Sequence, residues 1–272
     1  MLPVFVTSRV GEFRLFRRWW AEGHRFGLVT VPHKKVRQNN KRGPAVSANL
    51  AAHFADFPGP RYLDNGIFAG IPMTAAELLA YADGVNADYV FAPDVFGDSQ
   101  ATLAQAKITM ADYQRWRHWY HFALVGVAQG TRPEEYLACA GELLAMGYTH
   151  LAVGGLLRRR GDSEKSRRVG AGPLRRVDES LLWPTLHLIH DELDPPWLHV
   201  LGALHHERIP PFRLLGVTSA DSKQWTRAYT RFADYGRTES KALKDRFVRH
   251  FYFQWQLMLP GMVDEVPSND SD

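Results

Sequence analysis

The strongest constraint on the fold is a repeated alternation of short apolar runs with helical patterns. Eight runs rich in β-branched and aromatic residues occupy residues 2–8, 25–31, 61–66, 88–94, 122–130, 150–156, 198–204 and 213–221. Near-continuous apolar strands that alternate with helices are typical of a parallel sheet covered by helices. Eight such units in 272 residues predict an α/β protein that closes into a single (β/α)8 TIM barrel. An open doubly wound sheet is the alternative, but no Gly-x-Gly-x-x-Gly follows the first run to favour a dinucleotide fold.

Helical patterns fill most of the intervals between these runs. The clearest occupy residues 47–57, 74–85, 99–118, 132–147 and 178–193. Thr74, with Glu77 three residues later, predicts a capping box at the start of one helix. Thr131, followed by Pro133, is the expected N-cap of another.

The chain is expected to form one barrel domain, residues 1–262, followed by a tail. Aromatic residues within 237–262 predict a last helix that packs on the body of the domain. The acidic and polar residues 263–272 predict a disordered tail.

Cysteine content and hydropathy restrict the class of protein. Cys139 is the single cysteine, which excludes an intramolecular disulfide and a multi-cysteine zinc site. The N-terminus lacks a cationic segment followed by a long apolar one, and no run approaches about 18 uninterrupted apolar residues. These features predict a cytoplasmic protein with no membrane partner. Two histidine pairs, His187 with His190 and His205 with His206, match no strong metal-ligand spacing, so no metal site is predicted.

Basic residues are concentrated in two segments. The formal net charge is +4 and the pI about 9.2, which is compatible with a polyanionic partner. Residues 158–176 hold two acidic residues against eight basic ones: Arg158, Arg159, Arg160, Lys165, Arg167, Arg168, Arg175 and Arg176. This composition predicts a mobile basic loop after the sixth strand, which is either a nucleic-acid contact or an ordinary solvated loop. A second cluster follows the second run and contains Lys34, Lys35, Arg37, Lys41 and Arg42.

The residues on which the apolar runs end share a chemical character. Active sites of (β/α)8 barrels lie at the carboxyl ends of the strands. The runs in this chain end in three carboxylates, an amide and a glycine pair, at Asp64, Asp94, Gln129-Gly130, Gly154-Gly155 and Asp221. Each such residue alone is a common turn or helix cap. Together they offer the groups that bind a polar heterocycle.

Two carboxylates facing one centre suit cleavage and re-formation of a glycosidic bond. One attacks or stabilises the anomeric carbon while the other transfers a proton to or from the leaving group. An Asp and a Gln beside a glycine-rich turn match the donor and acceptor pattern of a purine, and glycine permits close approach of the backbone to the ring.

In order along the chain, the motifs resemble the tRNA-guanine transglycosylase superfamily. They are "YLDNGIF", "FAPDVFGD", "GVAQG", "AVGGL", "HVLGAL" and "GVTSADSKQW", and the resemblance spans roughly residues 2–235. It implies that Asp221 is the nucleophile that forms a covalent glycosyl-enzyme intermediate and that Asp64 is the general acid and base. It implies that the base is held by Asp94, Gln129, Gly154, Gly155 and Leu156. Asp98 is a second candidate near the fourth strand, ranked below Asp94 because its position fits a helix N-terminus.

Departures from the family shift the expected substrate. The tRNA enzymes carry a Cys-x-Cys-x2-Cys motif and a later His that bind structural zinc, whereas this chain has only Cys139. The chain is also shorter, and the Asp-Cys-Val usual after the nucleophile is replaced. It is most similar to the DNA 7-deazaguanine transglycosylase branch, which exchanges guanine in DNA for a preQ0-type base during phage or bacterial DNA modification. No cofactor is expected.

The resemblance implies DNA and a free 7-deazaguanine base as partners. Drawing a base out of the stack requires phosphate contacts and stacking side chains. The expected nucleic-acid contacts are Trp225, the 158–176 arginines and lysine, and Lys34 with Lys35. Trp19, Trp20, Trp116 and Trp119 are weaker candidates for stacking, because most tryptophans are core residues. A homodimer, or a partner protein that supplies sequence specificity, is an open alternative.

Three other functions stay open. The same exchange on tRNA is the nearest, and a catalytically silent barrel that binds nucleic acid as a subunit is another. A metabolic barrel for a small phosphorylated ligand is the most distant.

Overall fold

A closed barrel of eight parallel strands forms the centre of the protein. The computed structural model describes residues 1–7, 10–32, 44–67, 73–159 and 177–222. The barrel order is β1-β10-β9-β6-β5-β4-β3-β2, and every neighbouring pair is parallel. The strands are β1 (Leu2–Val6), β2 (Gly27–Thr30), β3 (Arg61–Leu63), β4 (Tyr89–Phe91), β5 (Ala123–Ala128), β6 (His150–Val153), β9 (Leu198–Val200) and β10 (Ser219–Ser222). The barrel predicted from the apolar runs is therefore confirmed.

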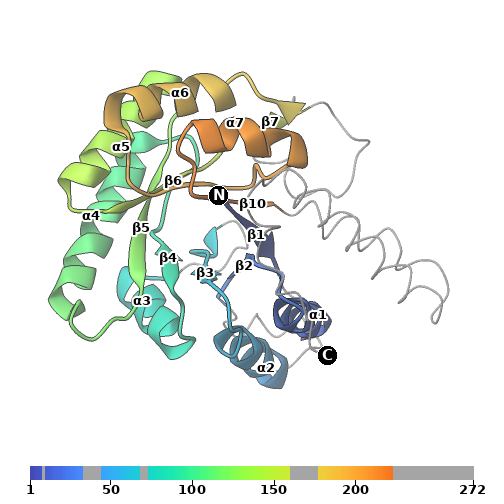
Figure 1. Cartoon of the computed structure of the whole chain (residues 1–272). Helices are drawn as coiled ribbons and strands as arrows, with labels where there is room; N and C mark the ends of the chain where they lie inside the picture. Colours follow the sequence, from blue (N-terminus) through green and yellow to red (C-terminus); the bar gives the residue numbers. More distant parts are fainter. Residues whose placement is uncertain (8–9, 33–43, 68–72, 160–176, 223–272) are drawn as a thin grey trace.

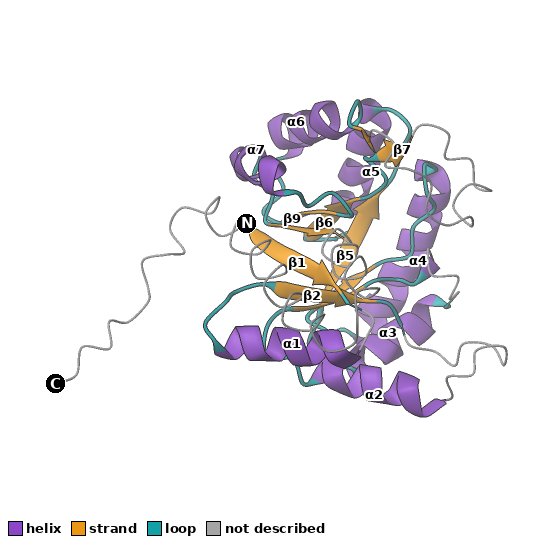
Figure 2. Ribbon diagram, turned by 90° about the vertical axis from the view of Figure 1, so that its right-hand side faces the viewer, coloured by secondary structure: helices purple, strands orange, loops and turns teal. Residues whose placement is uncertain are grey.

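Helices occupy the connections between successive barrel strands and lie outside the barrel (Figure 2). They are α1 (Val10–Ala21), α2 (Pro44–Ala55), α3 (Ala75–Gly84), α4 (Ser99–Trp116), α5 (Pro133–Ala145), α6 (Leu182–Leu193) and α7 (Ile209–Leu214). The five helical patterns found in the sequence are confirmed, with ends shifted by a few residues. The sequence analysis missed α1 and α7. In α1, Phe13, Phe16 and Trp19 are fully buried against the barrel at helical spacing.

The two predicted helix caps have different outcomes. The Thr74 side chain accepts from Glu77 N–H and the Glu77 carboxylate accepts from Thr74 N–H, so the capping box is confirmed. The prediction for Thr131 is wrong, because the N-cap of α5 is Arg132 and no side chain caps it. The N–H and hydroxyl of Thr131 instead donate to Glu135, both at 2.8 Å.

The eighth strand begins later than predicted. Residues 213–221 were expected to form it, but Leu214 ends α7 and is 81% exposed. The prolines at 210 and 211 stand in the first turn of α7, where proline favours a helix. Gly216 has a φ of +68° just after the helix. The strand then runs from Ser219 to Ser222, so Asp221 lies within it rather than at its last residue.

Two apolar clusters hold the fold together. The larger lies between barrel and helices and includes Phe5 stacked on Phe16, with ring centroids 5.1 Å apart. The smaller fills the barrel and includes Val4, Tyr62 and Phe91. Within the described residues, no helix has the length and hydropathy needed to cross a membrane.

A small antiparallel ribbon follows β6. Its strands are β7 (Arg158–Arg159) and β8 (Val177–Asp178), with Arg159 paired to Val177 (Figure 1). The ribbon joins the two ends of segment 160–176. That segment, the helix expected within 237–262, the boundary at 262 and the tail 263–272 lie outside the described residues.

Candidate active site at the carboxyl ends of the barrel strands

Strand alternation directs the predicted site residues into the barrel. Tyr62, Val127 and Ala152 belong to the apolar cluster inside the barrel. Side chains two positions apart on a strand point to the same side, so the residues two positions further on continue the inner face at its carboxyl end. These are Asp64, Gln129 and Gly154, and with Asp94 and Asp221 we call them the mouth.

Two side-chain amides hydrogen-bond the carboxylate of Asp94. Its side chain accepts from Asn65 Nδ2 at 2.7 Å on Oδ1 and from Gln129 Nε2 at 2.6 Å on Oδ2. Asp94 is 3% exposed, and burial raises the pKa of its carboxyl more than these two hydrogen bonds lower it. Asp94 and Gln129, which were predicted to share one base site, are therefore in direct contact.

Backbone groups set the orientation of both amides. Asn65 Oδ1 accepts from Ile67 N–H at 3.0 Å while its Nδ2 donates to Ala92 O at 3.0 Å. Gln129 Oε1 accepts from Gly97 N–H at 3.3 Å. Each amide nitrogen is therefore the end that faces Asp94. Sequence reasoning missed Asn65, although its place directly after Asp64 at a strand end was a usable signal.

The glycine pair provides space for the side chains around Asp94. A Cβ on Gly154 would lie 2.6 Å from Gln129 Nε2, and one on Gly155 would lie 2.7 Å from the Phe96 ring. Gly155 also has a φ of +72°, a conformation that side chains disfavour. Leu156, the third predicted member, is 1% exposed and belongs to the apolar cluster between barrel and helices. The Leu156 side chain therefore packs in the core.

Asp221 is held through one of its two oxygens. Oδ1 accepts from Gly202 N–H at 2.8 Å and lies 3.2 Å from His199 Nε2. Within the part of the chain that the structure describes, no hydrogen bond reaches Oδ2. The Asp221 side chain is 10% exposed, whereas that of His199 is fully buried. Asp221 thus has an anchored oxygen and one that is open to a ligand.

His199 is the residue that sequence reasoning missed most completely. Its Nδ1 lies 2.8 Å from Ser219 Oγ, so His199 connects Ser219 to Asp221. The only sequence signal was a histidine within the apolar run 198–204, at an alternating position of a buried strand.

Asp64 is engaged in a local turn. Its Oδ1 accepts from Gly66 N–H at 2.8 Å, and the side chain is partly exposed. It lies at the end of β3, which β1 and β2 separate from β10 in the barrel order. Asp98 caps α4 by accepting from Ala101 N–H at 2.9 Å, which confirms its predicted place at a helix N-terminus.

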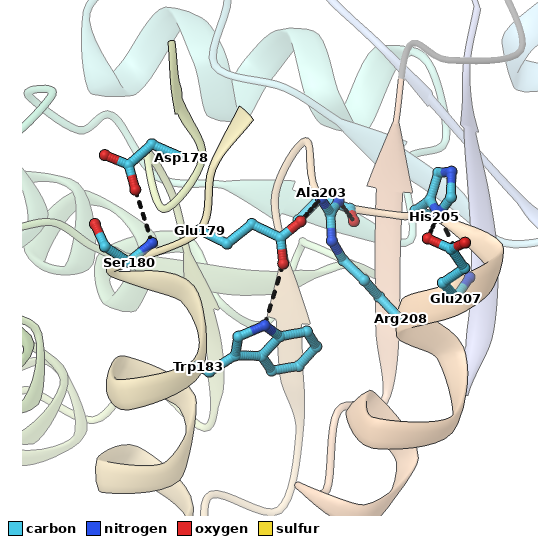
Figure 3. Close-up of polar contacts among 8 residues, drawn as sticks. All are labelled: Asp178, Glu179, Ser180, Trp183, Ala203, His205, Glu207 and Arg208. Carbon is cyan, nitrogen blue, oxygen red and sulfur yellow. Dashed lines mark hydrogen bonds and ion pairs between the residues drawn. The ribbon is translucent and has the colours of Figure 1, made fainter. Parts of the chain in front are cut away.

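A polar cluster supports the loop that carries Gly202. Arg208, in the short helix η3 (His206–Arg208), donates to Ala203 O at 2.8 Å and forms an ion pair with Glu179 (Figure 3). Glu179 also accepts from Trp183 Nε1 at 3.1 Å. Because Glu179 directly follows β8, this cluster ties the ribbon to the loop next to Asp221.

The predicted nucleic-acid contacts are only partly described. Arg158 and Arg159 form β7, which begins three residues after Gly155 at the mouth. Trp116 and Trp119 are 50% and 65% exposed, but they precede β5 and therefore lie at the opposite end of the barrel from the mouth. The remaining predicted contacts lie outside the described residues: Lys34, Lys35, Arg160, Lys165, Arg167, Arg168 and Trp225.

Comparison with known proteins adds no family. Neither the protein-family models nor the curated proteins include a match to this chain. Among the described residues, no group of three His, Cys, Asp or Glu side chains is arranged to hold a metal ion. The only cysteine of the chain, Cys139, is buried in α5.

Proposed function

We propose that the protein is a base-exchange glycosyltransferase that replaces guanine in DNA with a 7-deazaguanine base. The observation that carries this proposal is the geometry of Asp221, whose Oδ1 is fixed by two contacts while no described residue hydrogen-bonds Oδ2. A carboxylate held in this way suits a nucleophile, because the attacking oxygen keeps its lone pairs while the group cannot rotate.

The proposed reaction has two displacements at C1′ of the target nucleotide. Asp221 Oδ2 forms a bond to C1′ as the C1′–N9 bond breaks, and the electron pair of that bond goes to guanine. The Asp64 carboxyl transfers its proton to the departing guanine. The incoming 7-deazaguanine then loses its N9 proton to the Asp64 carboxylate and attacks C1′, and the Asp221–C1′ bond breaks. Side chains supply every group, so no cofactor is required.

Asp94 and Gln129 are proposed to bind the base. Each oxygen of a carboxylate accepts more than one hydrogen bond, so Asp94 retains acceptor capacity beside its two amide partners. Guanine and 7-deazaguanine share the ring N–H and amino group that such a carboxylate recognises. Gly154 and Gly155 leave the room that Gln129 and the Phe96 ring occupy beside the proposed base site.

The basic segment favours a nucleic-acid substrate over a small metabolite. Its first residues form β7 beside the mouth, and the cluster of Glu179 and Arg208 holds its far end near Gly202. Cationic side chains in this position would hold the phosphates of a strand whose base has left the stack. DNA is proposed over tRNA because the chain lacks the cysteines of the tRNA enzymes.

Trapping of a covalent adduct tests the proposal. Protein mixed with guanine-labelled DNA and a panel of 7-deazaguanines is expected to release guanine and to form a denaturation-stable protein–DNA adduct. Asp221→Asn should lower both by at least about 10³-fold, as loss of a nucleophile does. Asp98→Asn, at a helix cap outside the mouth, is the matched control and should keep both. If tRNA reacts in a parallel assay and DNA does not, the substrate assignment is wrong.

One observation favours a second candidate, a silent barrel that binds nucleic acid. Asp64 Oδ1 is already engaged by Gly66 N–H, which is an ordinary role for a strand-end aspartate. If wild-type protein binds DNA, forms no adduct with any base of the panel and keeps its affinity in Asp221→Asn, the silent barrel replaces the enzyme.

A further inference from the structure

We infer that His199 is a positioning residue that fixes Asp221 through a directional hydrogen-bond chain beginning at Ser219. The kinetic consequence rests on the proposed function, whereas the hydrogen bonds do not. The chain runs across two neighbouring strands, because β10 carries Ser219 and Asp221 and β9 carries His199.

The register of β9 and β10 creates this arrangement. Ser219 is the parallel partner of His199, and Ser219 and Asp221 are two positions apart, so both face the barrel interior. The imidazole therefore reaches Ser219 Oγ with Nδ1 at 2.8 Å and Asp221 Oδ1 with Nε2 at 3.2 Å. One ring spans both side chains.

The carboxylate at one end determines the proton positions. An ionised Asp221 only accepts, so the 3.2 Å contact between its Oδ1 and His199 Nε2 requires a proton on Nε2. In the neutral ring Nδ1 is then an acceptor, and the Ser219 hydroxyl must donate to it.

Packing fixes the ring plane. His199 is fully buried, and the rings of Phe91, Tyr62 and Trp197 lie with centroids 5.0, 5.6 and 6.0 Å from its own. A ring enclosed by three aromatic side chains cannot rotate freely, so Nε2 stays aimed at Asp221. The direction of the chain is therefore built into the barrel.

The same three residue types occur in serine hydrolases, but the arrangement here is inverted. A hydrolase serine must meet substrate, whereas Ser219 is fully buried and the Asp221 side chain retains 10% exposure. The reactive end of the chain is thus the carboxylate, and the serine is its buried end.

Nitrogen-15 NMR of histidine-labelled protein tests the hydrogen bonds without any activity. The His199 signal among the twelve histidines is assigned by its loss in His199→Gln. We expect a neutral ring protonated on Nε2 near pH 7, and a shift towards mixed tautomers in Ser219→Ala. A ring protonated on Nδ1, or on both nitrogens, would overturn the inference.

Adduct kinetics test the positioning role. Mutating a hydrogen-bond partner of a metal ligand typically lowers activity by about 10- to 100-fold, and we expect a similar factor for the partner of a nucleophile. His199→Leu, which keeps bulk but not the donor, should slow adduct formation by that factor at saturating DNA, with little change in DNA affinity. His199→Gln places an amide N–H near the Nε2 position and should recover most of the rate. His150→Leu, on neighbouring β6, is the matched control and should react like wild type.

The outcomes separate the two proposals. Equal rates in His199→Leu and wild type, or no recovery in His199→Gln, would overturn the positioning role. If wild-type protein itself forms no adduct, the proposed function fails, while the NMR result still decides whether His199 donates to Asp221. A loss of folding in His199→Leu would show in its circular dichroism, and the Ser219→Ala spectrum then carries the test.

Discussion

Inward-facing side chains line both ends of the barrel interior, but one end is aromatic and the other is polar. At the amino-terminal end, which we call the floor, lie Tyr62, Tyr89, His150 and Trp197. Successive rings lie close together. The ring centroids of Tyr62 and Tyr89 are 4.7 Å apart, those of Tyr89 and Trp197 are 5.1 Å apart, and those of Trp197 and His150 are 5.0 Å apart. The floor thus fills this end of the barrel with packed aromatic rings.

The mouth is polar and depends on hydrogen bonds that cross between strands. Asn65 and Gln129 both donate to Asp94, and Gly202 and His199 both contact Asp221. Burying such groups costs stability unless each is paired, so a polar mouth above an apolar floor is an arrangement that packing alone does not favour. The contrast teaches that the floor stabilises the barrel and that the mouth is where function is to be sought.

The largest expected effect lies at the floor. Tyr62→Ala removes a ring that contacts Tyr89 and Trp197 and should lower the free energy of unfolding by about 3–5 kcal/mol. Urea denaturation measures this change. Tyr62→Phe is the control, since it keeps the ring, loses only the buried hydroxyl and should cost about 1 kcal/mol. Equal losses in the two variants would show that packing does not dominate the floor.

At the mouth, removal of one hydrogen-bond donor should have a smaller effect. Gln129→Leu leaves Asp94 Oδ2 buried without its donor, and the expected cost is about 1–3 kcal/mol in urea denaturation. The double variant Gln129→Leu/Asp94→Leu removes both partners and should regain part of that stability. If Gln129→Leu unfolds with the free energy of wild type, the hydrogen bond from Gln129 does not stabilise buried Asp94.

A methyl group added at the mouth should cost less again. Gly154→Ala places a Cβ 2.6 Å from Gln129 Nε2, which must move, at about 1–2 kcal/mol. Gly141→Ala is the control, because it lies within α5 with nothing within 4 Å of its Cβ and should be neutral or slightly stabilising. If Gly154→Ala and Gly141→Ala have the same thermal stability, the close approach at Gly154 does not constrain Gln129.

The smallest effect concerns pH. Burial raises the pKa of Asp94 above its ordinary value of 3.8, so between that value and the raised one the folded protein binds more protons than the unfolded chain. Its contribution to the free energy of unfolding therefore falls as pH rises through this window. Asp94→Asn lacks the titrating group. The stability of wild type relative to this variant should decline from pH 4 upward in urea titrations; a relative stability that increases with pH would contradict the raised pKa.

The sequence was sufficient for the barrel because its signals are local. Each strand is a short apolar run bounded by turn residues, and eight of them in order admit few other folds. The same logic placed Asp94 and Gln129 at strand ends and separated Asp98 as a helix cap, and all three positions are confirmed. It failed at residues 213–221, where Leu214 and Leu215 have strand-like composition but the preceding prolines start a helix.

Only the tertiary structure decided which side chains of the mouth hydrogen-bond one another. That Asn65 joins Asp94, and that His199 links Ser219 to Asp221, depends on the register between strands far apart in the chain. A one-residue slip of β9 against β10 would turn His199 away from the interior while leaving every local pattern unchanged. Composition and periodicity thus determined which residues reach the carboxyl ends of the strands. Pairing between strands decided which of them touch, because hydrogen bonds need distances that sequence spacing does not set.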